Sequence, residues 1–186
     1  HVFVFLQPNA ALSLSQAQER EVAQGHMANI RRLSGLGTLI FAGPTGDGGG
    51  VFMLRAESAV SASDMLQADP AIAGGILLTD AFPVAMASGR ACQPSEPLTM
   101  KRRNFLSGRF NQLRQVALLR AGLQLSNYDL MLVDRASQRL VVVFDGEANG
   151  ARSSRAQQIA DRVGVRIHRN AEVFLPRGAL CEPLNP

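Results

Sequence analysis

The sequence is poor in residues on which several classes of protein depend. Its 186 residues include no tryptophan, one tyrosine and two cysteines, and of the 19 basic residues only Lys101 is a lysine. Two cysteines are too few for a disulfide scaffold, and they lack metal-ligand spacing with the three histidines. We therefore predict no metal site, and nothing in the sequence calls for an organic cofactor.

Long hydrophobic runs are absent as well. No apolar stretch approaches the ~18–20 residues of a membrane-spanning helix, so no membrane partner is expected. Hydrophobic residues make up 46% of the chain and charged residues 18%, which is ordinary for a folded globular protein. A chain of 186 residues can bury one sizeable core, two small ones, or two half-size modules that share a core.

The scarcity of aromatic residues bears on nucleic-acid binding. The formal net charge is +4, and one basic segment contains Lys101, Arg102, Arg103, Arg109, Arg114 and Arg120. Sheets that bind single-stranded RNA stack its bases on aromatic side chains, and this chain has no aromatic-rich strand of that kind. A solvated helix face is the simpler interpretation, so we predict no nucleic-acid partner.

The two cysteines mark a possible duplication. Cys92 and Cys181 lie 89 residues apart, and each closes its half of the chain with a similar small-residue, Cys-x-Pro ending. At the same offset the apolar run 51–54 corresponds to the run 140–143. We predict two related domains, at residues 1–94 and 95–186.

Both halves show the same order of extended and helical patterns. In the first half we predict a strand (1–6), a helix opened by a capping sequence at Ser13 (13–33), two strands around a glycine-dense hairpin loop (39–42, 51–55), a short helix ended by Pro70 (61–69), and a strand (76–84). In the second half we predict a strand (99–106), a helix with Gly122 as its C-cap (109–121), two strands (129–133, 139–144), a helix (153–162), and a strand in two parts (165–168, 172–175). The β-α-β-β-α-β order indicates an α+β protein of tandem ferredoxin-like modules.

Residues 1–88 carry a series of short motifs: His26-Met27-Ala28-Asn29-Ile30-Arg31-Arg32-Leu33, Ala42-Gly43-Pro44, Asp47-Gly48-Gly49-Gly50 and Ala68-Asp69-Pro70. With these motifs the first half resembles the YciI-like (YCII-related) family. The resemblance implies a small-molecule pocket in which His26 and Asp69 act as an acid/base pair, with Gly43 and Pro44 beside the ligand. Family modules usually pair sheet to sheet in an α+β barrel, so the resemblance implies a pseudo-dimer within one chain, either monomeric or further paired as a homodimer.

Taken without the resemblance, the same residues also fit structural roles. His26 shares the apolar stripe of its helix with Val22 and Ile30, as a hydrogen-bonded core histidine would. The proline after Asp69 can stop a helix while the carboxylate binds nearby backbone donors. The Gly43-Pro44 step fits a plain hairpin turn equally well.

The second half lacks the histidine. At offset 89 the position of His26 is taken by Gln115, and an alignment on the glycines places Leu113 there instead. Asp161 corresponds to Asp69 at an offset of 92. We therefore expect a structural or modulatory second module and restrict any chemistry to the first.

The predicted function is that of a small-molecule enzyme that transfers a proton in an isomerisation or an elimination, with His26 and Asp69 as the general acid–base pair. The resemblance further implies likeness to muconolactone-isomerase-like proteins and to a dehydrochlorinase of hydroxylated aromatics. The alternative is a non-catalytic ligand-binding or structural module.

The sequence leaves the compartment open between cytoplasm and periplasm. A start at His1 with no leader fits a trimmed chain or a processed one. Two free, buried thiols at Cys92 and Cys181 are the simpler expectation. A disulfide between them would instead favour the periplasm.

Overall fold

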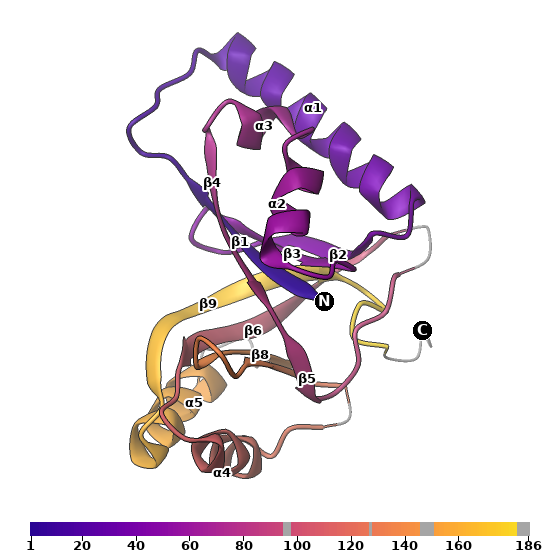
Figure 1. Ribbon diagram of the computed structural model, residues 1–186. Helices are drawn as coiled ribbons and strands as arrows, with labels where there is room; N and C mark the ends of the chain where they lie inside the picture. The colour runs from indigo at the N-terminus through magenta and orange to yellow at the C-terminus, as the bar shows by residue number, and fades with distance from the viewer. Residues whose placement is uncertain (95–97, 127, 146–150, 182–186) are drawn as a thin grey trace. The chain divides into compact units, whose positions relative to one another are not determined.

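The chain divides into two compact units, unit 1 (His1–Pro83) and unit 2 (Val84–Pro186). The computed structural model describes residues 1–94, 98–126, 128–145 and 151–181, with side chains for all of these except residues 151–153. Among the described residues the two units contain two antiparallel sheets and five helices (Figure 1). The predicted α+β class is thereby confirmed.

Unit 1 forms a four-stranded sheet with three helices. Its elements are β1 (Val2–Pro8), α1 (Gln16–Gly35), β2 (Leu39–Pro44), β3 (Gly50–Leu54), α2 (Ala59–Leu66), α3 (Pro70–Ala73) and β4 (Leu77–Pro83). The strand order in the sheet is β2-β3-β1-β4, and every neighbouring pair is antiparallel.

The sheet of unit 1 is apolar on both faces. Strands β1 and β3 contain consecutive apolar residues, and neighbouring residues of a strand point to opposite sides of the sheet. One face packs under the helices through β1 and β3 residues such as Val4 and Phe52, which meet Leu33 of α1 and Leu66 of α2. The other face carries three phenylalanines whose ring centroids lie 5.3–6.0 Å apart, Phe3, Phe5 and Phe82. Strands β1 and β3 therefore each supply two apolar layers.

Helix α1 begins two residues later than its predicted capping sequence. Ser15, and not Ser13, is the N-cap, and it forms a reciprocal capping box with Gln18. In this box the serine and the glutamine three residues later satisfy two backbone donors at the helix start, and Ser13 with Gln16 offers the same spacing in the sequence. Ser58 and Ser61 form a second capping box at the start of α2.

Pro70 begins a helix instead of ending one, which corrects the prediction. Helix α2 ends at Leu66, and the four-residue helix α3 starts at Pro70 with Asp69 as its N-cap. Proline suits this first helical position because the backbone N–H that it lacks would have no partner inside the helix. Asp69 is thus fixed at the junction of α2 and α3.

Unit 2 contains five strands and two helices among its described residues. They are β5 (Ala85–Ser88), β6 (Met100–Arg109), α4 (Leu113–Leu123), β7 (Leu130–Asp134), β8 (Arg139–Asp145), α5 (Ala151–Val163) and β9 (Arg166–Pro176). The strand order is β5-β7-β8-β6-β9. None of the described helices of the chain is long and apolar enough to span a membrane.

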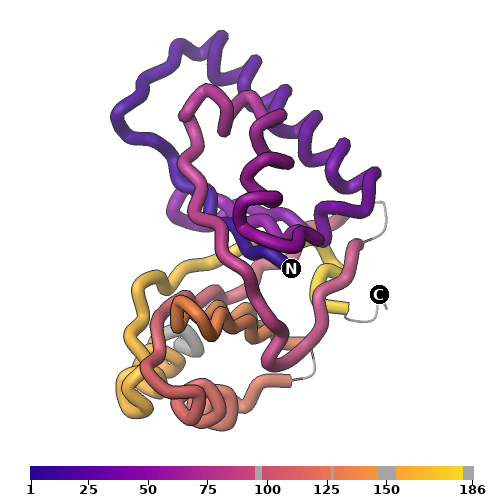
Figure 2. The backbone as a smooth tube through the Cα atoms, in the orientation of Figure 1, coloured from indigo at the N-terminus to yellow at the C-terminus, as the bar shows by residue number. Residues whose placement is uncertain are grey.

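The boundary between the units falls between Pro83 and Val84 and not between residues 94 and 95. The reason is strand β5, which pairs with β7 in the second sheet and so ties residues 85–88 to unit 2. Figure 2 traces the backbone from β4 directly into β5.

Helix α4 differs from its prediction at both ends. Arg109 belongs to strand β6, where it pairs with Arg139 and Arg166, so the helix starts four residues later. Gly122 lies inside the helix, and Gln124 forms the left-handed C-cap instead. A Cβ on Gly122 would stand 2.6 Å from Cγ2 of Ile159 on α5, so this glycine permits the close approach of α4 and α5.

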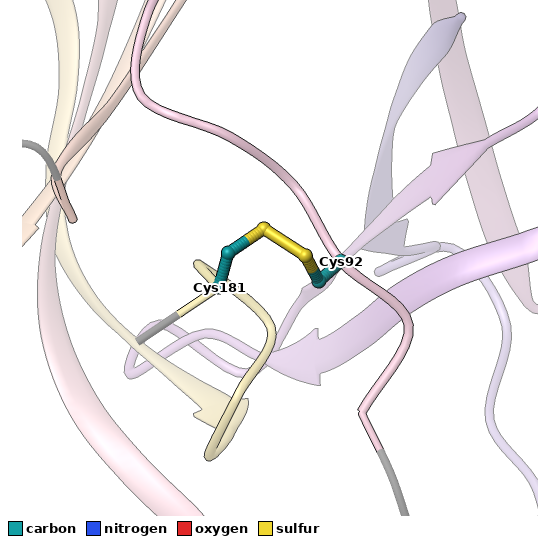
Figure 3. The surroundings of a disulfide bond; sticks show 2 residues. All are labelled: Cys92 and Cys181. Atoms are coloured by element: carbon teal, nitrogen blue, oxygen red, sulfur yellow. A yellow bond between two sulfur atoms is a disulfide. The ribbon is translucent and has the colours of Figure 1, made fainter. Parts of the chain in front are cut away.

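Cys92 and Cys181 form a disulfide inside unit 2 (Figure 3). Their Cα atoms lie 5.2 Å apart, and the backbone N–H of Cys92 also donates to the carbonyl of Ala179 at 2.9 Å. The expectation of two free thiols is therefore wrong. Because both residues belong to unit 2, the bond does not join the two units across a pseudo-twofold.

We predict that this disulfide stabilises unit 2. It closes a loop of 89 residues, and cross-links of this kind restrict the unfolded chain enough to contribute about 2–4 kcal/mol. Reduction should lower the urea midpoint of unfolding, followed by far-UV circular dichroism and by the fluorescence of Tyr128, the single tyrosine of the chain, which lies in unit 2. The double variant Cys92→Ala/Cys181→Ala should already have the low midpoint and should not respond to reductant. An unchanged midpoint after complete reduction would contradict this role.

Candidate functional site

The structure brings together the two residues predicted to act as a pair. His26 lies on α1 and Asp69 lies between α2 and α3, 43 residues further along the chain. Nδ1 of His26 and Oδ2 of Asp69 are 2.7 Å apart. The order of elements in unit 1 therefore produces a contact that sequence separation alone could not show.

The carboxylate of Asp69 has two separate tasks, one for each oxygen. Oδ1 accepts a hydrogen bond from the backbone N–H of Ala71 at 3.0 Å, which is the N-cap contact of α3. Oδ2 contacts His26 and accepts a hydrogen bond from Nδ2 of Asn29 at 3.1 Å. The side chain is fully buried. The structural role expected of an Asp-Pro step and the pairing implied by the family thus coexist in one residue.

The imidazole of His26 is held on one nitrogen and is partly exposed. Because the carboxylate accepts, Nδ1 carries a proton and donates it to Asp69, which leaves the lone pair of a neutral imidazole on Nε2. Within the described part of the chain no hydrogen bond engages Nε2, and 20% of the side chain is exposed. The ring stacks on Phe52 of β3 with centroids 5.9 Å apart and planes 12° from parallel.

Two further polar residues of α1, which the sequence motifs did not single out, belong to the site. Asn29 is buried and donates to Asp69, and its Oδ1 accepts from Nε of Arg32 at 3.2 Å and from Nη2 at 2.8 Å. His26, Asn29 and Arg32 recur every three residues and so share one side of the helix. The three-residue spacing could have indicated these residues from the sequence. Such spacing of polar side chains is common on helices, so by itself it does not identify a site.

Gly43 and Pro44 lie at the end of strand β2 and not in a turn. They pair with Val51 and Gly50 of β3, and the turn itself follows, closed by a hydrogen bond from the N–H of Thr45 to the carbonyl of Gly49 at 2.9 Å. The plain-turn interpretation is therefore wrong. Ala42 pairs with Phe52, so Pro44, two residues on, shares the sheet face that Phe52 presents to His26.

Unit 2 holds no matching pair among its described residues. Gln115 stands near the start of α4, where its Oε1 accepts from the N–H groups of Asn111 and Gln112 and its Nε2 donates to the carbonyl of Gly164. Leu113, the other aligned position, is the first residue of the same helix. Asp161 is exposed on α5 and accepts from Gln157, so it does not share the buried setting of Asp69.

The basic segment is not one solvated helix face. Lys101, Arg102 and Arg103 lie on strand β6, and each forms an ion pair within the second sheet. Arg103 is 2% exposed and pairs with Asp145, the same carboxylate that Lys101 contacts at 3.1 Å. These charges therefore serve the packing of β6 against β8 and β9. The described residues also contain no cluster of three histidine, cysteine, aspartate or glutamate side chains that could hold a metal ion.

No family model matches the chain, and no curated protein matches it. Fold and site geometry therefore define its class: an α+β protein whose first unit pairs a buried carboxylate with a partly exposed histidine.

We predict that Gly25, the residue before His26, is required for the site. A Cβ there would overlap Cγ of Pro70, so Gly25→Ala should push α1 away from α3 and destabilise the protein by about 1–3 kcal/mol. Gly35→Ala is the matched control on the same helix, because no atom lies within 4 Å of that Cβ position. The control should be neutral or up to about 1 kcal/mol more stable, as alanine favours helices. Equal stabilities of the two variants in urea unfolding would contradict close packing at Gly25.

Proposed function

We propose that unit 1 is a YciI-like module that transfers a proton on a small molecule, with His26 as general base and acid and Asp69 as its partner. The observation that carries this proposal is the 2.7 Å contact between Nδ1 of His26, whose side chain is 20% exposed, and a fully buried carboxylate. A histidine held in this way has one nitrogen fixed and one free to react.

The proposed chemistry uses Nε2. This nitrogen removes a proton from an acidic C–H of the substrate, and the imidazolium that forms is stabilised by its hydrogen bond to Asp69. In an isomerisation the same proton returns to another carbon of the substrate. In an elimination the electron pair of the broken C–H bond forms a double bond as a leaving group departs. Neither course needs an external oxidant or reductant.

The proposed place for the ligand is the end of the sheet face that carries Pro44. Pro44 lies on the same face of the first sheet as Phe52, which underlies the imidazole, so a ligand along that end of the face would lie beside both. Gly43 and Pro44 are the residues that the family resemblance implies for ligand binding. By the same resemblance the substrate is a hydroxylated aromatic ring or a small unsaturated lactone.

We further infer tandem ferredoxin-like modules that pair sheet to sheet as an α+β barrel. Two observations support this inference. The order β2-β3-β1-β4 in unit 1 has a counterpart in unit 2, where β7-β8-β6-β9 follow the same sequence of strands and helices once β5 and the short helix α3 are set aside. In addition, each sheet has a second apolar face, which carries Phe3 and Phe5 in unit 1 and Phe105 and Val143 in unit 2.

A non-catalytic ligand-binding or structural module is the second candidate. It is favoured by the N-cap bond of Asp69 to Ala71 and by the complete burial of the carboxylate, because both features would also stabilise a purely structural junction. The disulfide of unit 2 bears on the compartment under either candidate, and it favours an oxidising one such as the periplasm.

The proposal predicts that loss of the acceptor at position 69 reduces activity without loss of the fold. Asp69→Asn keeps an N-cap side chain but places an amide N–H₂ or a weaker acceptor against His26 and Asn29. His26→Gln removes the base. With deuterium uptake from D₂O into a panel of lactones and hydroxylated aromatics as the NMR assay, both variants should lower the exchange rate by about 10²–10⁴-fold.

Asp161→Asn is the matched control, because it makes the same change on an exposed carboxylate of α5 and should leave exchange unchanged. Exchange that persists in His26→Gln would overturn the mechanism. If no compound exchanges in the wild type while Asp69→Asn lowers the free energy of unfolding, the structural module is supported instead.

A further inference from the structure

A line of hydrogen-bond donors runs along one side of α1 toward the imidazole. Arg32 donates twice to Oδ1 of Asn29, Asn29 donates to Oδ2 of Asp69, and that same oxygen accepts from His26. Asn29 and Asp69 are both buried, so water does not readily replace either of them. The orientation of the His26 ring therefore depends on Asn29 and Arg32, which act on the ring only through Asp69.

The guanidinium of Arg32 decides which way the amide of Asn29 faces. A side-chain amide has an acceptor end and a donor end of nearly equal shape, and its hydrogen-bond partners select between the two orientations. Arg32 can only donate, so it holds the oxygen of Asn29 and leaves the N–H₂ group for Asp69. The reversed amide would turn an oxygen toward a carboxylate oxygen, which is repulsive.

We infer that Asn29 and Arg32 are positioning residues for His26. They fix the Oδ2 atom of Asp69, which in turn fixes the proton of the imidazole on Nδ1 and leaves Nε2 as the reactive nitrogen. The use of Nε2 in proton transfer rests on the proposed function, whereas the placement of the Nδ1 proton does not.

A structural role for the same residues makes a different prediction. Nη2 of Arg32 also lies 3.5 Å from the carbonyl of Met65 in α2, so the guanidinium could serve only to dock α1 on α2. Asn29→Asp separates the two roles. An aspartate at position 29 keeps the shape and still accepts from Arg32, now as an ion pair, but it cannot donate to Asp69.

Four variants test the inference. Asn29→Asp removes the donor, Arg32→Ala frees the amide to turn, and Arg32→Lys retains a charged donor on one nitrogen in place of two. Arg31→Ala is the control, because Arg31 is an exposed neighbour on the same helix. If Asn29→Asp fails to fold because it places two carboxylates in contact, Arg32→Ala decides the question alone.

The readout is the ¹⁵N and ¹H NMR signal of the His26 ring, measured without any substrate. The chain has only three histidines, and His26→Gln assigns the signal. In the wild type and in Arg31→Ala we expect the tautomer with the proton on Nδ1 and a slowly exchanging N–H. In Asn29→Asp and Arg32→Ala that proton should exchange with water about 10–100-fold faster, because the carboxylate that holds it loses a hydrogen bond of the charge-assisted kind. Arg32→Lys should fall between these limits.

An unchanged tautomer and exchange rate in folded Asn29→Asp or Arg32→Ala would overturn the inference. The deuterium-uptake assay distinguishes this failure from failure of the proposed function. If the wild type exchanges no proton of any substrate, the proposed enzymatic function is contradicted, whatever the NMR signal shows. If the wild type is active but the His26 ring signal is the same in Asn29→Asp and Arg32→Ala as in the wild type, only the positioning role is contradicted.

Discussion

The buried carboxylate of Asp69 is the group on which the site of unit 1 depends. It accepts from the backbone of α3 and from two side chains of α1, so three donors converge on one side chain that has no access to water. Loss of any of them would leave a polar group unsatisfied in the interior, which is costly. The same arrangement that satisfies this carboxylate also places the imidazole, so stability and possible chemistry rest on the same bonds.

The two units are stabilised by different means. In unit 1 the junction of α1, α2 and α3 combines an apolar core with the hydrogen bonds around Asp69 and with the close contact of Gly25 and Pro70. Among the described residues of unit 2 the corresponding region has no such junction. Ion pairs along β6 and a disulfide that closes 89 residues support it instead. Among the residues that the structure describes, a histidine contacts a buried carboxylate only in unit 1. There the carboxylate belongs to Asp69, which also caps the short helix α3.

Periodicity and turn residues predicted where most elements lie, because apolar alternation and helical stripes are local properties of the chain. All four strands of unit 1 were placed to within two residues. The failures occurred where long-range packing overrides local signals. Gly122 predicts a helix end, yet the helix continues to Leu123 and Gln124 forms its cap, while the missing Cβ of Gly122 leaves room for Ile159 of α5. Pro70 predicts the end of a helix, yet it is the first residue of α3, which Asp69 caps.

By itself the sequence determined the α+β class, the order of most elements, and the presence of His26 and Asp69 in the first half of the chain. Only the tertiary structure decided that the two residues touch, that Asn29 and Arg32 complete the same network, and that Cys92 bonds to Cys181 within one unit. The physical reason is distance along the chain. A contact across 43 residues or a bond across 89 depends on how helices and strands pack, and neither leaves a periodic trace in the residues between its ends.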